Sequence, residues 1–488
     1  MNTTKSTKYI FILGGVMSGL GKGIAASSIG YLLKQAGVKV TILKLDPYLN
    51  VDPGTMNPYQ HGEVFVLDDG SETDLDLGHY ERFIDVNMTK NNNATAGQIY
   101  STVLDRERKG EYLGDTVQVI PHITDEIIKR IKAVNNPKKY DVVICEVGGT
   151  VGDIESLPFM EAIRQLSLEV GYHNHMLVHV TLLPYVKASG ELKSKPTQHS
   201  VMKLREIGLA PDMIFCRSEH SIEQSVRDKI ALFCNVRPDH VIEGLDVPTI
   251  YEVPLLMHEQ NAGELINDRL NIEKEPSLKE LRKFIHNFKN PSHEVTIAMC
   301  GKYTELIDSY KSVMEAFIHA GVENNARVNV KWIQTEKIKN DITAQKAFQD
   351  VDGILLLPGF GSRGSEGKIH SSKYARENKI PFLGICLGLQ CAVIDFARNV
   401  CGMKGANSTE FDKNTNFPVI DLMESQRAIK IKGGTMRLGA YDCEIKTGTK
   451  TYAAYRKKKI SERHRHRYEV NNRYRKKLEK NGLVFSGV

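Results

Sequence analysis

A glycine-rich segment near the start of the sequence has the residue types needed to hold phosphate groups. It reads Gly14-Gly-Val-Met-Ser-Gly-Leu-Gly-Lys-Gly23 and lies between an apolar run and a stretch with helical periodicity. Its glycines let backbone N–H groups converge on phosphate oxygens, and the following helix adds the positive end of its dipole. Lys22 adds a full positive charge. This position favours phosphate binding over an ordinary glycine-rich turn.

The segment departs from the common pattern GxxxxGK[ST], because Gly23 stands where a hydroxyl side chain usually contacts Mg²⁺. Carboxylates elsewhere must then hold the metal. The candidates are Asp76, in the acidic segment Glu72-Thr-Asp-Leu-Asp76, and Glu146, at the end of an apolar run. Ligands bind open α/β sheets at that end of the strands. A solvated loop acid explains Asp76 equally well, whereas an acid that ends a buried strand needs a partner.

A second candidate for chemistry is the cysteine in Gly384-Ile-Cys-Leu-Gly-Leu-Gln390, which follows one apolar run and precedes another. The pattern predicts a sharp turn with Cys386 at the N-terminus of a helix, where a thiolate is stabilised. We therefore expect Cys386 to be a nucleophile. A buried structural cysteine is the alternative, which fits Cys391 and Cys401 well but not a cysteine flanked by glycines.

The elements that position these residues alternate between strands and helices, which predicts an α/β fold with a doubly wound, mostly parallel sheet. A helix is predicted over residues 24–34, and strands are predicted at residues 9–13, 38–45, 140–147, 176–183 and 212–216. After a charged stretch, a second α/β domain is predicted from strands at residues 294–299, 328–333, 353–357 and 381–385. We expect a first domain over residues 1–272, a linker over residues 273–294 and a second domain over residues 295–488.

Composition argues against several classes of protein. The 65 Lys+Arg and 59 Asp+Glu residues give a net charge of only +6, which fits a pocket for small anions better than general nucleic-acid binding. The eight cysteines form no CxxC pair, so reduced thiols in a cytosolic protein are expected, not a zinc site or a disulfide scaffold. The first apolar run is too short to span a bilayer and lacks a signal cleavage site, so no membrane association is expected.

Longer motifs make the interpretation more specific. They include Lys44-Leu-Asp-Pro-Tyr48, His61-Gly-Glu-Val-Phe65, the run from Gly148 to Phe159, and Lys195-Pro-Thr-Gln-His-Ser200. These motifs are similar to the amidoligase domain of the CTP synthase family, in which a class I glutamine amidotransferase domain follows. The segment around Cys386 resembles the nucleophile elbow of that second domain. The resemblance runs from about residue 8 to the last residue.

The resemblance implies that ATP phosphorylates the 4-oxygen of UTP and that ammonia then displaces phosphate to give CTP. Lys22 and Lys44 would clamp the transferring phosphoryl group. Asp76 and Glu146 would be the Mg²⁺ ligands. The residues that the family implies for the ATP site are Gly19, Leu20, Gly21, Lys22, Gly23, Ile24, Asp76, Arg217, Asp246 and Val247.

The resemblance also assigns the other binding sites. UTP, and CTP as feedback inhibitor, would contact Ser18, Asp153, Ile154, Glu155, Lys193, Ser194, Lys195, Pro196, Thr197, Gln198 and Lys229. The residues alone favour a solvated basic loop before Pro196, although the two lysines there can reach a triphosphate. Substrate glutamine would be held by Gly359, Leu387, Gly388, Leu389, Gln390, Glu410 and Arg467. Gly359 and the N–H of Leu387 would form the oxyanion hole.

Two departures from the family concern this glutaminase half. Pro358 replaces a glycine next to the oxyanion residue Gly359, and proline has no N–H and a fixed φ. The family's catalytic His and Glu lie in a Phe-His-Pro-Glu-Phe segment that this sequence lacks, and only His464 and His466 follow Cys386. We expect the second domain to be incomplete at its C-terminus. Glutaminase activity should be weak or absent, because general acid–base catalysis is usually worth about a hundredfold or more.

The leading hypothesis is a glutamine-hydrolysing CTP synthase, a ligase that forms a C–N bond in pyrimidine biosynthesis and still uses free ammonia. A catalytically reduced nucleotide-binding or filament-forming regulatory paralogue is the alternative. A different ATP-dependent ligase, such as a dethiobiotin synthetase or a cobyrinate amidase, is opposed by the long motifs. The resemblance further implies GTP as activator, a homotetramer and a cytoplasmic location, with neither nucleic acid nor a membrane as partner.

Overall fold

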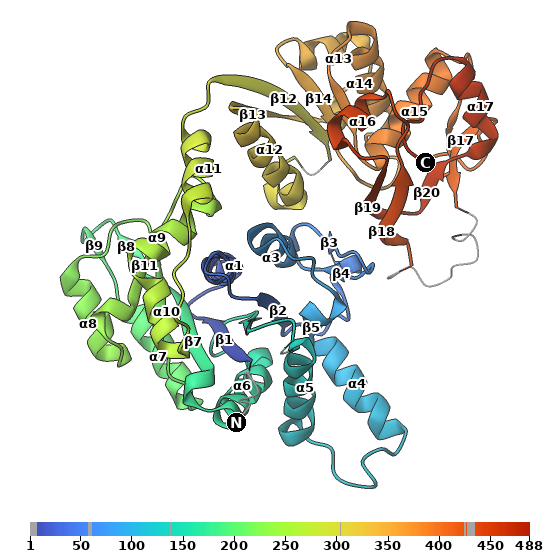
Figure 1. The fold of residues 1–488 in the computed structure, drawn as a ribbon. Coiled ribbons are helices and arrows are strands. Elements are labelled where there is room, and N and C mark those ends of the chain that lie inside the picture. Colours follow the sequence, from blue (N-terminus) through green and yellow to red (C-terminus); the bar gives the residue numbers. More distant parts are fainter. Residues whose placement is uncertain (1–6, 57–60, 137, 303, 424–425, 427–434) are drawn as a thin grey trace. The chain divides into compact units, whose positions relative to one another are not determined.

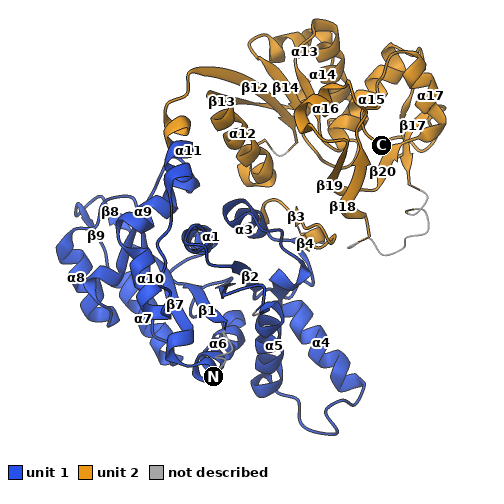
Figure 2. Cartoon of the chain, viewed as in Figure 1, with its two compact units in different colours: residues 1–53, 73–285 blue, residues 54–72, 286–488 orange. Residues whose placement is uncertain are grey.

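The structure is a computed structural model that describes residues 7–56, 61–136, 138–302, 304–423, 426 and 435–488. The chain forms two compact units, shown in different colours in Figure 2. Unit 1 comprises residues 1–53 and 73–285, and unit 2 comprises residues 54–72 and 286–488. Among the described residues, none of the helices combines the length and the apolar character that crossing a bilayer requires.

Unit 1 is built on a seven-stranded parallel sheet in the order β11-β10-β7-β1-β6-β2-β5. Its strands, drawn in Figure 1, are β1 (Lys8–Gly14), β2 (Val40–Asp46), β5 (Asn93–Thr95), β6 (Val142–Val147), β7 (His175–Leu182), β10 (Met213–Ser218) and β11 (Val241–Leu245). The five strands predicted here are confirmed, with ends that shift by no more than two residues. Their apolar runs are buried, as expected for strands covered on both faces.

Helices cover both faces of this sheet, which is the predicted doubly wound arrangement (Figure 1). On one face, Phe11 of β1 belongs to the same buried cluster as Ile99, Ile127 and Ile163 of three helices. On the other face, Gly30 packs so closely that a Cβ atom there would lie 2.9 Å from Ile84. The helices are α1 (Lys22–Gln35), α3 (Asp76–Ile84), α4 (Ala96–Arg108), α5 (Thr124–Val134), α6 (Leu157–Val170), α7 (Lys195–Glu206), α8 (Gln224–Cys234), α9 (Val253–Glu259) and α10 (Ala262–Leu270).

A charged helix, α11 (Lys279–Lys289), lies within the predicted linker and leads to unit 2. Unit 2 is built on a four-stranded parallel sheet in the order β13-β12-β14-β15. The four predicted strands are found as β12 (His293–Gly301), β13 (Ala326–Gln334), β14 (Gly353–Leu356) and β15 (Phe382–Gly384). The helices are α12 (Lys311–Glu323), α13 (Asp341–Phe348), α14 (Ser365–Asn378) and α15 (Leu387–Asn399).

The rest of unit 2 is built from short elements. They are β16 (Asn407–Ser408), β17 (Pro418–Leu422), β18 (Arg437–Glu444), α16 (Lys450–Tyr455), β19 (Lys459–His466), β20 (Tyr468–Val470) and α17 (Asn472–Lys480). The antiparallel pair β18–β19 packs against the segment that carries β3 (Phe65–Val66). Gly439 is needed at this contact, because it has φ 92° and a Cβ atom there would lie 2.7 Å from the carbonyl oxygen of Asp68.

Candidate functional site

The glycine-rich segment joins β1 to α1 in unit 1, as predicted. Gly19 and Gly21 have φ angles of 75° and 82°, in the left-handed region that glycine adopts without strain. Val16 has φ 77°, an unusual backbone conformation for a β-branched residue. Such strained residues cluster at ligand-binding turns. The loop and the N-terminus of α1 therefore have the backbone geometry of a phosphate site.

Lys44 lies at the centre of a buried charge cluster beside this loop. Its Nζ atom donates to Glu146 Oε1 at 2.7 Å and forms a short ion pair with Asp76. The hydroxyl group of Tyr80 donates to the other carboxylate oxygen of Glu146. The structure thus brings together two strand residues and two residues of α3 that are far apart in the sequence.

Lys22, at the start of α1, points toward the same cluster. Its Nζ atom donates to the carbonyl oxygen of Gly149 at 2.7 Å, and Gly14 leaves room for its side chain, because a Cβ atom there would lie 2.6 Å from Lys22 Cδ. Burial lowers the pKa of the Lys22 ammonium group, an effect that the nearby carboxylate of Glu146 opposes. A buried lysine at the end of a phosphate-binding turn is suited to an anionic ligand.

The carboxylate of Asp76 explains the glycine at position 23. A Cβ atom on Gly23 would lie 2.1 Å from Asp76 Oδ1. Asp76 therefore occupies the space next to the helix where the common pattern would put a hydroxyl side chain. The interpretation of Asp76 as a solvated loop acid is wrong, because the residue begins α3 and is paired with Lys44.

The cluster holds more acids than bases. Besides the two lysines it contains Asp46, Asp74, Asp76 and Glu146, which interact electrostatically with one another. Burial raises the pKa of the Asp46, Asp74 and Glu146 carboxyl groups. Burial also disfavours the charged forms of Asp76 and Lys44, but the attraction between these two side chains outweighs it. The pKa of Asp76 is therefore lowered, and the pKa of Lys44, which Glu146 also attracts, is raised. This excess of negative charge suits a divalent cation.

The carboxylates of this cluster can bind Mg²⁺ only if a bound ligand supplies further oxygen atoms. Within the described part of the chain, no group of three His, Cys, Asp or Glu side chains is arranged to hold a metal ion on its own. Mg²⁺ commonly takes one or two carboxylates and completes its shell with phosphate oxygens and water. Asp76 and Glu146 can supply those carboxylates beside the phosphate loop.

Glu72, the first acid of the segment Glu72-Thr-Asp-Leu-Asp76, belongs to unit 2 and not to unit 1. Its Oε1 atom accepts from Arg465 Nε at 2.7 Å inside unit 2. The boundary between the two units falls inside the acidic segment, so Glu72 and Asp76 belong to different units. Asp76 and Glu146 remain the predicted metal ligands.

The other residues assigned to ATP lie at the ends of neighbouring strands. Arg217 of β10 forms a short ion pair with Asp246, which follows β11 and precedes Val247. The guanidinium group of Arg217 also approaches the phosphate loop, since a Cβ atom on Gly21 would lie 4.0 Å from its Nη1 atom. Arg217 and the phosphate loop therefore share one edge of the sheet.

Four of the residues assigned to UTP, Lys195–Gln198, form the first turn of α7. Lys193 and Ser194 lie in a loop before it, as expected, and Lys195 is exposed but begins the helix. Proline is tolerated in a first helical turn, which explains Pro196. Gln198 Nε2 donates to the buried Ser194 hydroxyl at 3.0 Å, and Thr197 Oγ1 donates to a carbonyl oxygen of β7 at 3.2 Å. Their polar atoms hold the turn in place.

Two of the basic residues assigned to UTP interact with Glu191. Lys193 forms a short ion pair with Glu191, and its hydrogen bond lowers the pKa of that carboxyl group. Lys229 contributes to the same effect. Asp153, Ile154 and Glu155 lie exposed beyond Gly149, whose carbonyl oxygen holds Lys22. They are thus next to the phosphate loop and accessible to a ligand.

His179 is a buried site residue that sequence reasoning missed. Its Nε2 atom lies 2.8 Å from the hydroxyl of Ser200 on α7, and its Nδ1 atom has no hydrogen-bond partner among the described residues. Gly15 packs against both side chains, because a Cβ atom there would lie 1.5 Å from Ser200 Oγ and 2.9 Å from His179 Nε2. Burial lowers the pKa of His179 to about 3, so a neutral imidazole joins the phosphate loop to α7.

Cys386 forms a sharp turn between β15 and α15, as predicted. Its backbone has φ 53° and ψ −109°, a strained conformation for a residue with a side chain. The flanking glycines are required, because a Cβ atom on Gly384 would lie 2.6 Å from the backbone of Gly388, and one on Gly388 would lie 2.3 Å from the carbonyl oxygen of Leu356. The turn presents the thiol at the N-terminus of α15.

The prediction that this thiolate is stabilised is wrong for the protein without a ligand. Burial raises the pKa of Cys386. The N–H of Leu387 and the charges of Lys368 and Arg465 oppose that rise but do not reverse it. Desolvation of the thiolate therefore exceeds the effect of the helix N-terminus.

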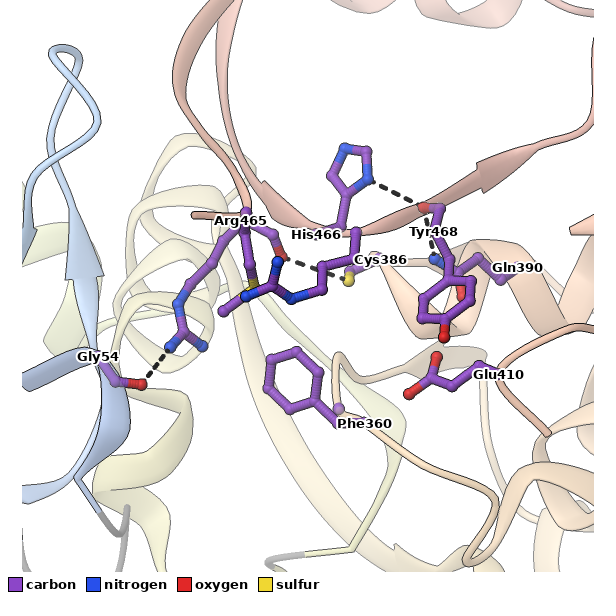
Figure 3. A pocket seen from close by; sticks show the side chains of 11 residues that line it. Gly54, Phe360, Cys386, Gln390, Glu410, Arg465, His466 and Tyr468 are labelled. Atoms are coloured by element: carbon purple, nitrogen blue, oxygen red, sulfur yellow. Dashed lines mark hydrogen bonds between the residues drawn. The ribbon is translucent and has the colours of Figure 1, made fainter. Parts of the chain in front are cut away.

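The thiol opens onto a cavity of about 270 Å³, shown in Figure 3. Four residues assigned to glutamine lie in its wall, and the other three belong to the first turn of α15, beside Cys386. The complete lining is Gly54, Gly359, Phe360, Cys386, Gln390, Glu410, Met436, Arg465, His466, Arg467 and Tyr468.

Hydrogen bonds fix the polar side chains of this pocket. Glu410 Oε1 accepts from the N–H of Gly361 at 2.6 Å, and Gln390 Nε2 donates to the carbonyl oxygen of Tyr468 at 3.1 Å. Arg467 donates to Gln426 at 2.7 Å. Burial raises the pKa of the Glu410 carboxyl group, so it is suited to meet a cationic group such as the α-ammonium of an amino acid.

The two histidines that follow Cys386 bond to each other. His464 Nδ1 and His466 Nε2 lie 2.9 Å apart, and His466 Nδ1 lies 2.9 Å from the carbonyl oxygen of Tyr468. The sulfur of Cys386 contacts the carbonyl oxygen of Arg465 at 3.9 Å. Both ring nitrogens of His466 are thus engaged away from the thiol, although this residue lines the pocket.

Comparison with known proteins shows the family of this chain. A family model described as CTP synthase N-terminus matches residues 8–272, and one described as glutamine amidotransferase class-I matches residues 305–488. The CTP synthase of Caldanaerobacter subterraneus is 60% identical over 482 residues, which cover 99% of this chain and 90% of that protein. The CTP synthase of Methanocaldococcus jannaschii is 58% identical over 489 residues, with the same two coverages. A solved glutaminase domain of Trypanosoma brucei CTPS with bound acivicin is 39% identical, with a TM-score of 0.37, and covers 40% of this chain and 75% of that chain. The chain belongs to the CTP synthase family.

Proposed function

We propose that this protein converts UTP to CTP with ATP and ammonia. The 4-oxygen of UTP attacks the γ-phosphorus of ATP, the bond to the β-phosphate oxygen breaks, and ADP leaves. Ammonia then adds to C4 of the uracil ring, and the C4–O bond breaks to release inorganic phosphate. A C–N bond forms overall, and the uracil oxygen leaves as part of phosphate instead of as a poor leaving group.

The observation that supports this proposal most is the buried cluster of Lys22, Lys44, Asp76 and Glu146 beside the phosphate loop. The two ammonium groups can balance the negative charge of the phosphoryl group during transfer. Asp76 and Glu146 would hold Mg²⁺, which would supply positive charge to neutralise the phosphate groups. Tyr80 and Lys44 hold the Glu146 carboxylate by hydrogen bonds from both sides, which fixes its position.

Arg217 and Asp246 are proposed to contact ATP from the neighbouring strand ends, together with Gly19–Ile24 and Val247. The first turn of α7 and residues Lys193 and Lys229 are proposed to hold UTP. Ser18 and the exposed segment Asp153–Glu155 complete the sites for UTP and for CTP as inhibitor. His179 of β7 is hydrogen-bonded to Ser200 of α7, and Gly15 of the phosphate loop packs against both side chains, which supports the proposal that the two nucleotides bind close together.

Unit 2 is proposed to supply ammonia from glutamine. The Cys386 thiolate attacks the amide carbon, and the C–N bond breaks to release ammonia and leave a thioester, which water hydrolyses to glutamate. Gly359 and the N–H of Leu387 would stabilise the oxyanion, and Glu410 and Arg467 would hold the charged ends of glutamine. The bonded pair His464 and His466 offers no base directed at the thiol, so this step is the weaker part of the proposed activity.

Further properties are proposed from the family alone. They are GTP as an activator of the glutaminase, a homotetramer in which subunits share the UTP site, and a location in the cytoplasm. We also propose that residues 1–272 carry the amidoligase function and residues 295–488 the amidotransferase function, with residues 273–294 as the linker. The first test of the proposed function depends on none of these properties.

That test is the formation of CTP from UTP, ATP and Mg²⁺ with ammonium chloride, measured by liquid chromatography. The expected result is CTP and ADP in equal amounts, with no CTP when ATP is omitted. The variant Cys386→Ser should retain this activity, because added ammonia bypasses the thiol. Nucleotide binding without CTP formation from ammonium would contradict the proposal and favour a regulatory nucleotide-binding protein.

A further inference from the structure

Lys368 is a fully buried lysine beneath the cysteine turn of unit 2. It lies on α14, its side chain is 0% exposed, and its Nζ atom donates to the carbonyl oxygen of Leu357. Lysine is almost never completely buried unless a partner compensates its charge. A buried cation of this kind needs an explanation.

No acidic partner for this lysine is found among the described residues. The groups that influence its charge most are three thiols and another lysine, and none of them is a carboxylate. The three thiols belong to Cys300, Cys386 and Cys391. Burial lowers the pKa of Lys368 to about 8, so the ammonium form still predominates at neutral pH. An isolated buried charge is costly unless an opposite charge appears during function.

The position of Lys368 connects it with the proposed oxyanion loop, residues 358–361. Leu357, whose carbonyl oxygen it holds, directly precedes this loop. A Cβ atom on Gly359 would lie 3.8 Å from Lys368 Nζ and 3.5 Å from Leu387 Cδ2, so the ammonium group lies directly behind Gly359.

A second lysine holds the other end of the loop. Lys302 Nζ donates to the carbonyl oxygen of Phe360 and lies 3.4 Å from that of Gly361. The N–H of Gly361 donates to Glu410. The carbonyl groups at both ends of the loop are therefore bound by ammonium groups.

We propose that Lys368 is a positioning residue of the glutaminase site. Its side chain fixes the start of the oxyanion loop and places a positive charge behind Cys386. This charge balances the negative charge that forms on the thiolate and the oxyanion. The proposal rests on the proposed glutaminase function of unit 2. Under this proposal, the negative charge that compensates the buried Lys368 forms only when the thiol loses its proton or a substrate carbonyl is attacked.

Other charged groups also act on the thiol and must be kept constant. Lys368 faces it from α14, Arg465 from β19 and Glu410 from the segment after β16. Lys302 follows β12 and acts on Lys368 itself, whose pKa it lowers. His466 lines the same pocket. A change at Lys368 alone leaves all of these residues in place.

The test measures the reactivity of Cys386 in the full chain as a function of pH. Iodoacetamide reacts with the thiolate, and peptide mass spectrometry separates Cys386 from the other seven of the eight cysteines. Loss of a neighbouring positive charge raises a thiol pKa by about one unit or more. Lys368→Met should therefore slow alkylation of Cys386 about tenfold at pH 7.5 and shift its midpoint upward by about one pH unit.

Two further variants make the result specific. Lys368→Gln keeps a donor for the carbonyl oxygen of Leu357 but removes the charge, so its alkylation should slow as much as that of Lys368→Met. Lys373→Met removes a half-buried lysine of the same helix that is ion-paired with Asp341, and should leave Cys386 unchanged. Unchanged alkylation midpoints in folded Lys368→Met and Lys368→Gln would overturn the proposal. Loss of the native circular dichroism spectrum in both would also overturn it, because the role of Lys368 would then be structural.

The experiment separates this inference from the proposed function. Alkylation requires no turnover, so a shifted midpoint supports the role of Lys368 even if the chain releases no glutamate from glutamine. In that case the proposed glutaminase function would be wrong, but the proposed effect of the Lys368 charge on Cys386 would be supported. Glutamate release by the unchanged chain, together with an unshifted midpoint in the variants, would leave the function intact and refute the inference.

Discussion

Gly23→Ala tests the idea that the Asp76 carboxylate replaces the usual hydroxyl group of the phosphate loop. The added Cβ atom would lie 2.1 Å from Asp76 Oδ1 and 2.7 Å from its Cγ atom. The side chain of Asp76 is short and is held by Lys44, so it cannot move aside without weakening that ion pair. The substitution therefore displaces a site residue while adding a single methyl group.

The size of the effect follows from the distance. Asp76 must retreat by about 1.3 Å to restore an ordinary contact of 3.4 Å, and a displacement of about 1 Å in an active site can cost about a hundredfold in rate. Overpacking of this kind usually destabilises a protein by about 1–3 kcal/mol. We expect CTP formation from ammonium to fall about a hundredfold, with a modest loss of thermal stability.

The assay is the initial rate of CTP formation with ammonium chloride at saturating UTP and ATP, together with thermal unfolding of the same preparations. The matched control is Gly263→Ala on α10, where nothing lies within 4 Å of the added atom. This control should keep its rate and its stability. A Gly23→Ala variant within twofold of the unchanged chain would refute the assignment of Asp76.

Other predictions concern the second substrate and the buried histidine. Because His464 and His466 bond to each other and not to the Cys386 thiol, CTP formation from glutamine should be about a hundredfold less efficient than from ammonium; equal efficiency would refute the expectation. His179 has a folded-state pKa of about 3, below its value in the unfolded chain, so its contribution to stability is present above about pH 6.5 and is lost as the pH falls toward 3. The fall in melting temperature between pH 7 and pH 5 should therefore be smaller in His179→Gln, and an identical pH dependence would contradict the burial of a neutral imidazole.

The sequence was sufficient to predict the parts of the fold that depend on local pattern. Continuous apolar runs predicted nine strands of the two parallel sheets, because a strand buried on both faces has no polar positions. Glycines next to Lys22 and Cys386 predicted both turns. The structure requires Gly21 for its positive φ, and it requires Gly384 and Gly388 because no side chain fits there. The residues assigned to each ligand by resemblance remain predictions.

Features that depend on contacts between distant segments were not evident from the sequence. Asp46 is the last residue of β2, and Glu146 lies near the end of β6. The rule that ligands bind at the carboxyl ends of parallel strands, which identified Glu146, could therefore have identified Asp46 as well. No pattern in the sequence indicated that residues 54–72 belong to unit 2. The pKa of Cys386 was predicted in the wrong direction, because the sequence shows the helix N-terminus but not the depth of burial.

The central claim is that the cluster beside the phosphate loop carries out phosphoryl transfer to UTP. The most direct test replaces Lys22 with alanine and measures CTP formation from ammonium chloride, which excludes any contribution from unit 2. The control is Lys34→Ala at the other end of α1, where the lysine pairs with Asp85 at 3.5 Å away from the site. We predict a loss of about a hundredfold or more in Lys22→Ala and a nearly unchanged rate in the control. An undiminished rate in a folded Lys22→Ala protein would contradict the account.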